Sequence, residues 1–171
     1  MGGTEQEQVA GWFAGRLPQE WFTEAAEVTV DRDEVVVVGR IESPTGPGAG
    51  AEEAHEAALG RISRFREDTR EQRMAIAREA ERRFERKVSW GVHCGEERAL
   101  FTHVAAPVMT RLRQPERQVL DTLVEAGVAR SRADALAWCV RLVGQHAEDW
   151  LGQLREAMTS VQRLRSEGPG L

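Results

Sequence analysis

Residues 120–143 read LDTLVEAGVARSRADALAWCVRLV, and this stretch predicts two helices joined by a tight turn. Gly127 is placed to end the first helix, because glycine readily takes the left-handed conformation that follows a helix. Ser131, with Asp134 three residues later, is typical of the start of a helix, where the hydroxyl accepts a hydrogen bond from a first-turn amide. Arg130 and Arg132 flank this serine. They are either solvated charges beside a cap or ligands for a phosphate.

The segment before this stretch predicts a short strand and the start of a helix. Residues 108–113 read VMTRLR, and strand alternation places their side chains on two faces. The more apolar face carries Val108, Thr110 and Leu112, and the other carries Met109, Arg111 and Arg113. Pro115 suits the first turn of the following helix. The alternative is that Pro107 begins a helix through 108–113, which Pro115 then ends.

A regular apolar pattern follows the second helix to the end of the chain. Its members recur at alternating spacings of four and three, which indicates a helix that packs against a partner. We interpret it as a dimer seam, whose main residues are Leu136, Val140, Val143, Trp150, Leu154 and Val161. Gly144 lowers helix stability, so a break near it is an open possibility.

Residues 108–143, VMTRLRQPERQVLDTLVEAGVARSRADALAWCVRLV, resemble the ribbon-helix-helix superfamily of dimeric DNA-binding proteins. The resemblance implies that two chains pair 108–113 into an antiparallel ribbon that enters the major groove. It also implies that the amides at the start of the second helix bind a phosphate. The DNA-binding residues that it implies are Met109, Arg111, Arg113, Arg130, Ser131 and Arg132. Arg111 is the candidate for a bidentate contact to guanine. Glu116 and Arg117 depart from the family, which usually has an apolar pair there.

The whole chain of 171 residues predicts an α+β protein that is mainly helical. A helix plus β-hairpin module is expected over 1–42, a Gly/Pro-rich linker over 43–50, and one long charged helix over 51–87. A second hairpin over 88–106 precedes the ribbon-helix-helix-like unit at 107–146 and a C-terminal helix and tail at 147–171.

The charges are distributed unevenly along the chain. Residues 1–51 contain three basic and nine acidic side chains. Residues 52–87 contain ten basic and nine acidic side chains, and residues 88–171 contain ten of each kind. The net charge of −5 therefore comes from the first third, and it does not exclude a C-terminal part that binds a polyanion.

The residues that could support catalysis are sparse, so we expect no enzyme, no metal site and no cofactor. His93, Cys94, His103, Cys139 and His146 lack the paired spacings of a zinc site, and no phosphate loop or nucleophile elbow is present. Two cysteines give no disulfide framework and fit a cytoplasmic protein. No apolar run approaches the length of a membrane span, and no secretory signal is visible.

Three functions follow from these patterns. The leading hypothesis is a homodimer that binds double-stranded DNA as a transcriptional regulator or nucleoid-associated factor, with a protein partner possible at residues 1–87. The alternative is a non-enzymatic interaction or scaffold dimer, in which the seam only associates two chains. A third is an antitoxin-like protein, in which residues 1–87 wrap a toxin.

Overall fold

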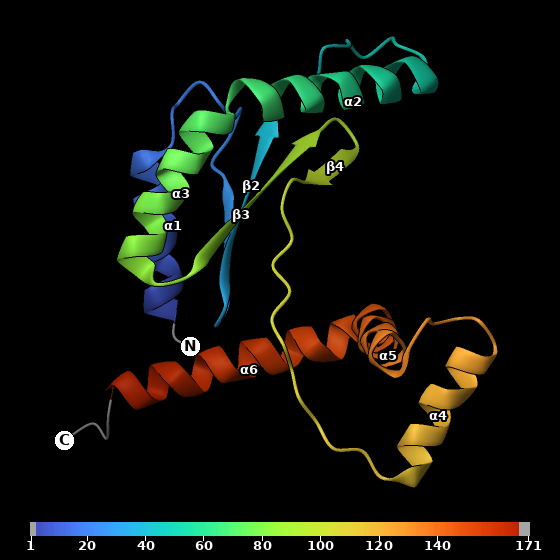
Figure 1. Ribbon diagram of the computed structural model, residues 1–171. Coiled ribbons are helices and arrows are strands. Elements are labelled where there is room, and N and C mark those ends of the chain that lie inside the picture. The colour runs from blue at the N-terminus through green and yellow to red at the C-terminus, as the bar shows by residue number, and fades with distance from the viewer. Residues whose placement is uncertain (1–2, 168–171) are drawn as a thin grey trace. The chain divides into compact units, whose positions relative to one another are not determined.

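The computed structural model describes residues 3–167 and shows an α+β protein made of two units, residues 1–106 and 107–171 (Figure 1). The tail expected at the C-terminus includes residues 168–171, which lie outside the described residues. Among those residues, no helix is long and apolar enough to cross a membrane. Each unit has its own hydrophobic cluster.

Unit 1 is a four-stranded sheet with three helices. Its elements are α1 (Gly3–Arg16), β1 (Glu27–Val30), β2 (Glu34–Ile41), α2 (Ala51–Asp68), α3 (Arg70–Phe84), β3 (Lys87–Cys94) and β4 (Glu97–Leu100). The strand order is β1-β2-β3-β4, with β2 and β3 parallel and both outer pairs antiparallel. The chain from β2 to β3 passes through both α2 and α3, which is the crossover that a parallel pair requires.

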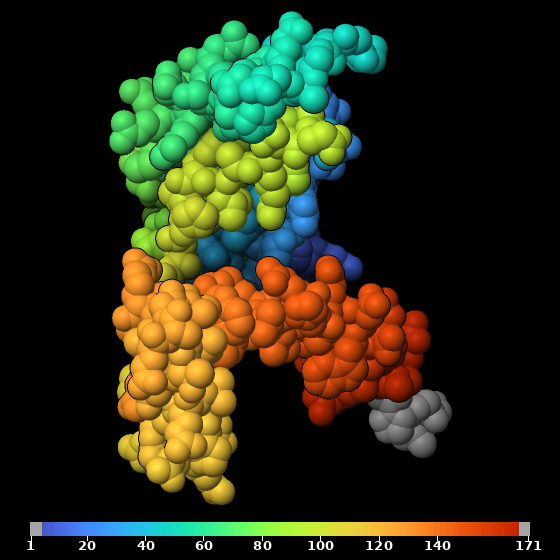
Figure 2. Space-filling model, turned by 90° about the vertical axis from the view of Figure 1, so that its right-hand side faces the viewer, coloured from blue at the N-terminus to red at the C-terminus, as the bar shows by residue number. Residues whose placement is uncertain are grey.

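The register of the central strands explains the core of unit 1. Val37 pairs with Trp90, and Ile41 pairs with Cys94, so alternate residues of both strands lie on one face. These residues are buried in one cluster with α1, α2 and α3. In Figure 2 the blue-green atoms of α2 lie against the yellow-green atoms of β3 and β4, as the contacts between these elements indicate.

The two expected hairpins are present but belong to the same sheet. Asp31 accepts hydrogen bonds from the amides of Asp33 and Glu34 at the first turn, both 2.8 Å, and Gly95 takes a positive φ of 59° at the second. Residues 1–42 and 88–106 are expected to form separate modules, whereas the β2–β3 pairing joins them in the structure. Residues 43–50 therefore connect two elements of unit 1 and do not separate domains.

The expectation of one long helix over 51–87 is wrong. The helix ends at Asp68 and restarts at Arg70, and the left-handed Glu85 then ends α3 before Lys87 begins β3. At Thr69 the hydroxyl donates to the carbonyl of Phe65 at 2.6 Å, and the Thr69 amide donates to the same carbonyl at 3.1 Å. A threonine that bonds back to the preceding turn in this way often bends a helix.

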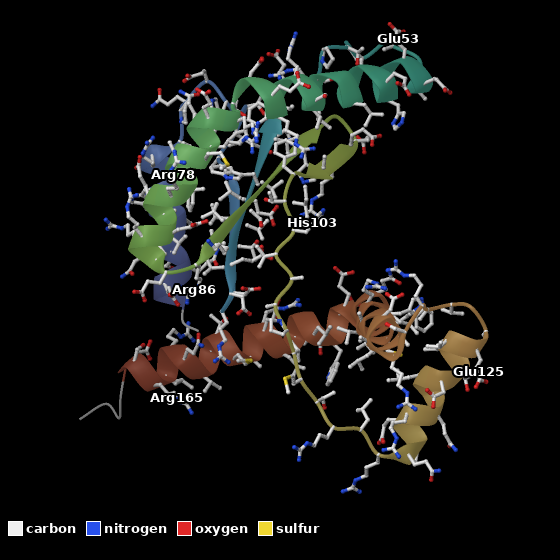
Figure 3. The ribbon with its side chains drawn as sticks, in the orientation of Figure 1. Glu53, Arg78, Arg86, His103, Glu125 and Arg165 are labelled. Carbon is white, nitrogen blue, oxygen red and sulfur yellow. The ribbon has the colours of Figure 1, made fainter. Side chains whose placement is uncertain are left out.

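Unit 2 contains α4 (Gln114–Glu125), α5 (Arg132–His146) and α6 (Glu148–Glu167). The turn after α4 has the expected glycine: Gly127 has φ 74°, its amide bonds to the carbonyl of Val124, and the amide of Val128 bonds to that of Leu123. Figure 3 labels Glu125 at the end of α4 and Arg165 near the end of α6.

The hydrophobic cluster of unit 2 is small. Its buried members are Leu120, Ala129 and Ala135, and the half-buried residues around them are Leu112, Leu123, Val124, Leu136 and Cys139. Because α6 has no buried residue, the apolar side chains of this unit are largely unpacked within one chain.

Candidate nucleic-acid interface

The segment before α4 is extended and largely exposed. Residues 102–113 contain neither helix nor strand, so the alternative of a helix through 108–113 is wrong. Val108 and Met109 are 88% and 95% exposed, and Arg111 and Arg113 are exposed as well. A ribbon requires a second chain, and the ribbon itself therefore stays a prediction.

One residue ties this segment to the helices behind it. Leu112, placed by the sequence on the inner face, is half-buried against the cluster of α4 and α5. Its carbonyl accepts a hydrogen bond of 2.6 Å from Nη1 of Arg117. Arg117 thus holds the extended segment against α4.

The start of α5 is capped as expected. Oγ of Ser131 accepts a hydrogen bond of 3.1 Å from the amide of Asp134, and Oδ2 of Asp134 accepts one of 3.1 Å from the amide of Arg130. The backbone hydrogen bond from Arg130, followed by its side-chain bond, lowers the pKa of Asp134. The cap fixes where α5 begins and therefore where its free first-turn amides point.

Both arginines beside Ser131 have carboxylate partners. Nε and Nη2 of Arg132 each lie 2.7 Å from an oxygen of Asp121 on α4. Nε of Arg130 lies 3.3 Å from Oδ2 of Asp134. The side-chain hydrogen bond to Arg132 lowers the pKa of Asp121, and the same bond raises the pKa of Arg132.

These pairs make the formal charge of the expected phosphate site zero, since two arginines face two aspartates. Sequence reasoning missed Asp121, which lies eleven residues before Arg132 in the preceding helix. The two residues meet only because the turn at Gly127 folds α5 back along α4.

The expected seam is divided between two helices. α5 ends at His146, and Ala147 has φ −118° and ψ 23°, so the break lies just after Gly144 and Leu136–Val161 is not one continuous helix. Leu136 packs in the unit 2 cluster. The other seam residues are exposed: Val140 65%, Val143 53%, Trp150 59%, Leu154 41% and Val161 49%.

Two sequence families match the two units separately. The Rv1265-like protein N-terminal domain matches residues 7–100, and the Mb1296 C-terminal domain matches residues 113–165. The first match lies within unit 1 and covers more than half of the chain. The chain belongs to the Rv1265-like protein family. Neither family description names an activity or a ligand.

Relatives in mycobacteria are similar over nearly the whole chain. The chain is 58% identical to the uncharacterized protein Rv1265 of Mycobacterium tuberculosis, over 99% of this chain and 76% of the relative. The same values hold for the uncharacterized protein Mb1296 of Mycobacterium bovis. No solved structure matches the chain.

The candidates for chemistry are divided between the two units: His93, Cys94 and His103 belong to unit 1, and Cys139 and His146 belong to α5. Cys94 is buried in the core of unit 1, and burial raises the pKa of its thiol. Within residues 3–167, no group of three His, Cys, Asp or Glu side chains could hold a metal ion.

Proposed function

We propose that this member of the Rv1265-like family is a homodimeric, non-enzymatic DNA-binding protein that acts in the cytoplasm as a transcriptional regulator or nucleoid-associated factor. In this proposal unit 2 binds double-stranded DNA and unit 1 binds a protein partner. The two free cysteines, Cys94 and Cys139, agree with a reducing compartment.

The observation that carries this proposal is the extended segment at 108–113. It contains no helix, and its last residue, Arg113, has an extended backbone with φ −80° and ψ 172° directly before α4. Leu112 packs on the helices, and the apolar residues Val108 and Met109 are exposed. A single isolated strand is unstable in water, whereas two copies paired about a two-fold axis satisfy each other's backbone groups. The alternation then presents Met109, Arg111 and Arg113 to the major groove.

The dimer supplies the packing that one chain lacks. Val140, Val143, Trp150, Leu154 and Val161 are exposed on α5 and α6, and a second copy would bury them. Exposed apolar surface of this extent is typical of an interaction site.

The arginines divide into two roles. Arg111 has the fork that addresses a guanine edge, so Arg111→Ala should lose about 1–3 kcal/mol on a selected site and much less on random DNA. Arg130 and Arg132 lie at the start of α5, where a backbone phosphate binds. Their replacement by alanine should weaken all duplexes alike and lower the salt slope by about one.

The test begins with selection of preferred duplexes from a random pool by the full-length chain. Affinities of wild type and Arg111→Ala are then measured on selected and unselected duplexes. Arg155→Ala, which removes an exposed arginine from α6, is the matched control. A loss confined to Arg111→Ala and to the selected duplex supports the proposal, and an equal loss for both variants argues against base reading.

A specific observation favours a second function. Because Arg130 and Arg132 are paired with aspartates, the site lacks the net positive charge of a strong DNA-binding surface. The exposed apolar residues of α5 and α6 would serve equally in a scaffold that only joins proteins. A folded dimer that binds no duplex at low salt would favour this function.

A further inference from the structure

Arg132 and Asp121 form a fork-to-fork pair at the surface of unit 2. Two parallel N–H···O bonds of 2.7 Å join the Nε and Nη2 edge of the guanidinium to the two carboxylate oxygens. Arg132 is the first residue of α5, and Asp121 lies in the middle of α4. This is the edge and the geometry with which an arginine binds two oxygens of a phosphate.

Asp134 and Asp121 differ in their hydrogen-bond partners. Asp134 accepts a backbone amide of the cap as well as the Arg130 side chain. Among the described residues, the side chain of Asp121 has hydrogen bonds from Arg132 alone. The Asp121 carboxylate thus takes no part in forming the helix start, and its negative charge acts on Arg132.

We propose that Asp121 is an affinity-setting residue of the DNA site, an internal carboxylate that occupies the phosphate-binding edge of Arg132. A DNA phosphate must displace it to bind the Nε and Nη2 edge of Arg132, and the displaced carboxylate then repels that phosphate. This inference rests on the proposed DNA-binding function and adds a residue that lowers affinity for every sequence alike.

The exposure of the pair sets the size of the effect. The side chains of Arg132 and Asp121 are 57% and 41% exposed, so solvent screens their attraction. Exposed pairs of this kind are weak enough for a phosphate to displace, and their usual strength corresponds to a gain of roughly two- to five-fold when the carboxylate is removed. Removal also leaves one more positive charge to release counterions from DNA.

The experiment compares four full-length proteins: wild type, Asp121→Asn, Arg132→Ala and the double variant. Binding to a fluorescent random-sequence duplex is measured by anisotropy at several salt concentrations. Asp121→Asn should bind about two- to five-fold more tightly than wild type at low salt. In the Arg132→Ala background the same change should have a much smaller effect, because no guanidinium remains to be released.

Glu125→Gln is the matched control, since it removes one exposed negative charge near the end of the same helix (Figure 3). It reports the long-range effect of charge alone. The proposal is overturned if Asp121→Asn binds no more tightly than Glu125→Gln, or if its gain is undiminished without Arg132. Thermal unfolding checks that the variants fold, and Asp121→Ser gives the same comparison if the asparagine disturbs α4.

The outcomes separate this inference from the proposed function. If wild type binds DNA and Asp121→Asn changes nothing, the DNA-binding function stands and the role of Asp121 is wrong. If none of the folded proteins binds at low salt, both are wrong.

Discussion

The guanidinium of Arg73 lies over the ring of Phe101, with Cζ 4.8 Å from the ring centroid. Arg73 is only 6% exposed, and it donates to Oγ1 of Thr69 at 2.9 Å and to the carbonyl of Arg66 at 2.6 Å. Through these contacts Arg73, in α3, links the last turn of α2 to Phe101, the residue that follows β4. Burial, followed by the nearby charges of Arg66 and Arg70, lowers its pKa.

We expect Arg73→Met to lower the free energy of unfolding of unit 1 by about 1–3 kcal/mol, because the carbonyl of Arg66 and the hydroxyl of Thr69 lose their donor. Urea denaturation of the full-length chain measures this loss. Arg70→Met, at an exposed position of the same helix, should change stability by less than about 0.5 kcal/mol. Equal losses for the two substitutions would show that the buried contacts of Arg73 do not add to the free energy of unfolding.

Arg16 and Glu79 predict a pH dependence of unit 1. Nε and Nη2 of Arg16 each lie 2.7 Å from a carboxylate oxygen of Glu79, and this hydrogen bonding lowers the pKa of Glu79 in the folded state. The pair thus stabilises the fold above the ordinary pKa of a glutamate, and this stabilisation disappears as the pH falls through the lowered folded pKa.

Urea unfolding between neutral pH and about pH 3 tests this sign. Glu79→Gln should lower stability at neutral pH and reduce the loss of stability in acid. Glu71→Gln, also on α3, is the control. A steeper acid loss in Glu79→Gln than in wild type would contradict the assignment.

The exposed seam predicts an obligate dimer. Val140→Glu together with Leu154→Glu should dissociate or unfold unit 2, because burial of unpaired carboxylates in an interface is unfavourable. Multi-angle light scattering measures the molar mass of each variant. Gln145→Glu with Gln153→Glu adds the same charge at exposed neighbouring positions and should leave the dimer intact. A folded wild-type monomer at micromolar concentration would refute the prediction.

The boundary between the units predicts which fragment retains DNA binding. A fragment that begins at Glu52 loses β2, the parallel partner of β3, so unit 1 should not fold in it. A fragment of residues 107–171 keeps the whole of unit 2 and should bind DNA with the same salt dependence as the full chain. If this fragment is folded and dimeric but does not bind while the full chain does, unit 1 contributes to the site.

The features that sequence predicted are those with local causes. The cap at Ser131 and the glycine turn at Gly127 each depend on residues within a few positions, so their chemistry is visible in the sequence. Of the three residues that strand alternation places inward, Leu112 is half-buried against the helices, whereas Val108 and Thr110 are exposed.

The features that sequence did not predict depend on distant residues. The parallel pairing of Val37 with Trp90 requires the crossover through α2 and α3. The valine-rich sequence of β2 does not indicate that β3 is its second partner in the sheet. The partner of Arg132 was missed for the same reason, because Asp121 belongs to the preceding helix. The break at Thr69 was missed because helix-forming residues continue on both sides of it.

DNA binding by unit 2 is tested by the affinity of the full-length chain for a random-sequence duplex of about 25 base pairs, measured by anisotropy from low to physiological salt. We expect saturable binding at low salt, with log affinity falling linearly against log salt by about 0.9 for each phosphate contacted. Arg132→Ala should reduce that slope by about one. A folded dimer whose anisotropy signal stays flat at the lowest salt concentration would contradict the claim that unit 2 binds DNA.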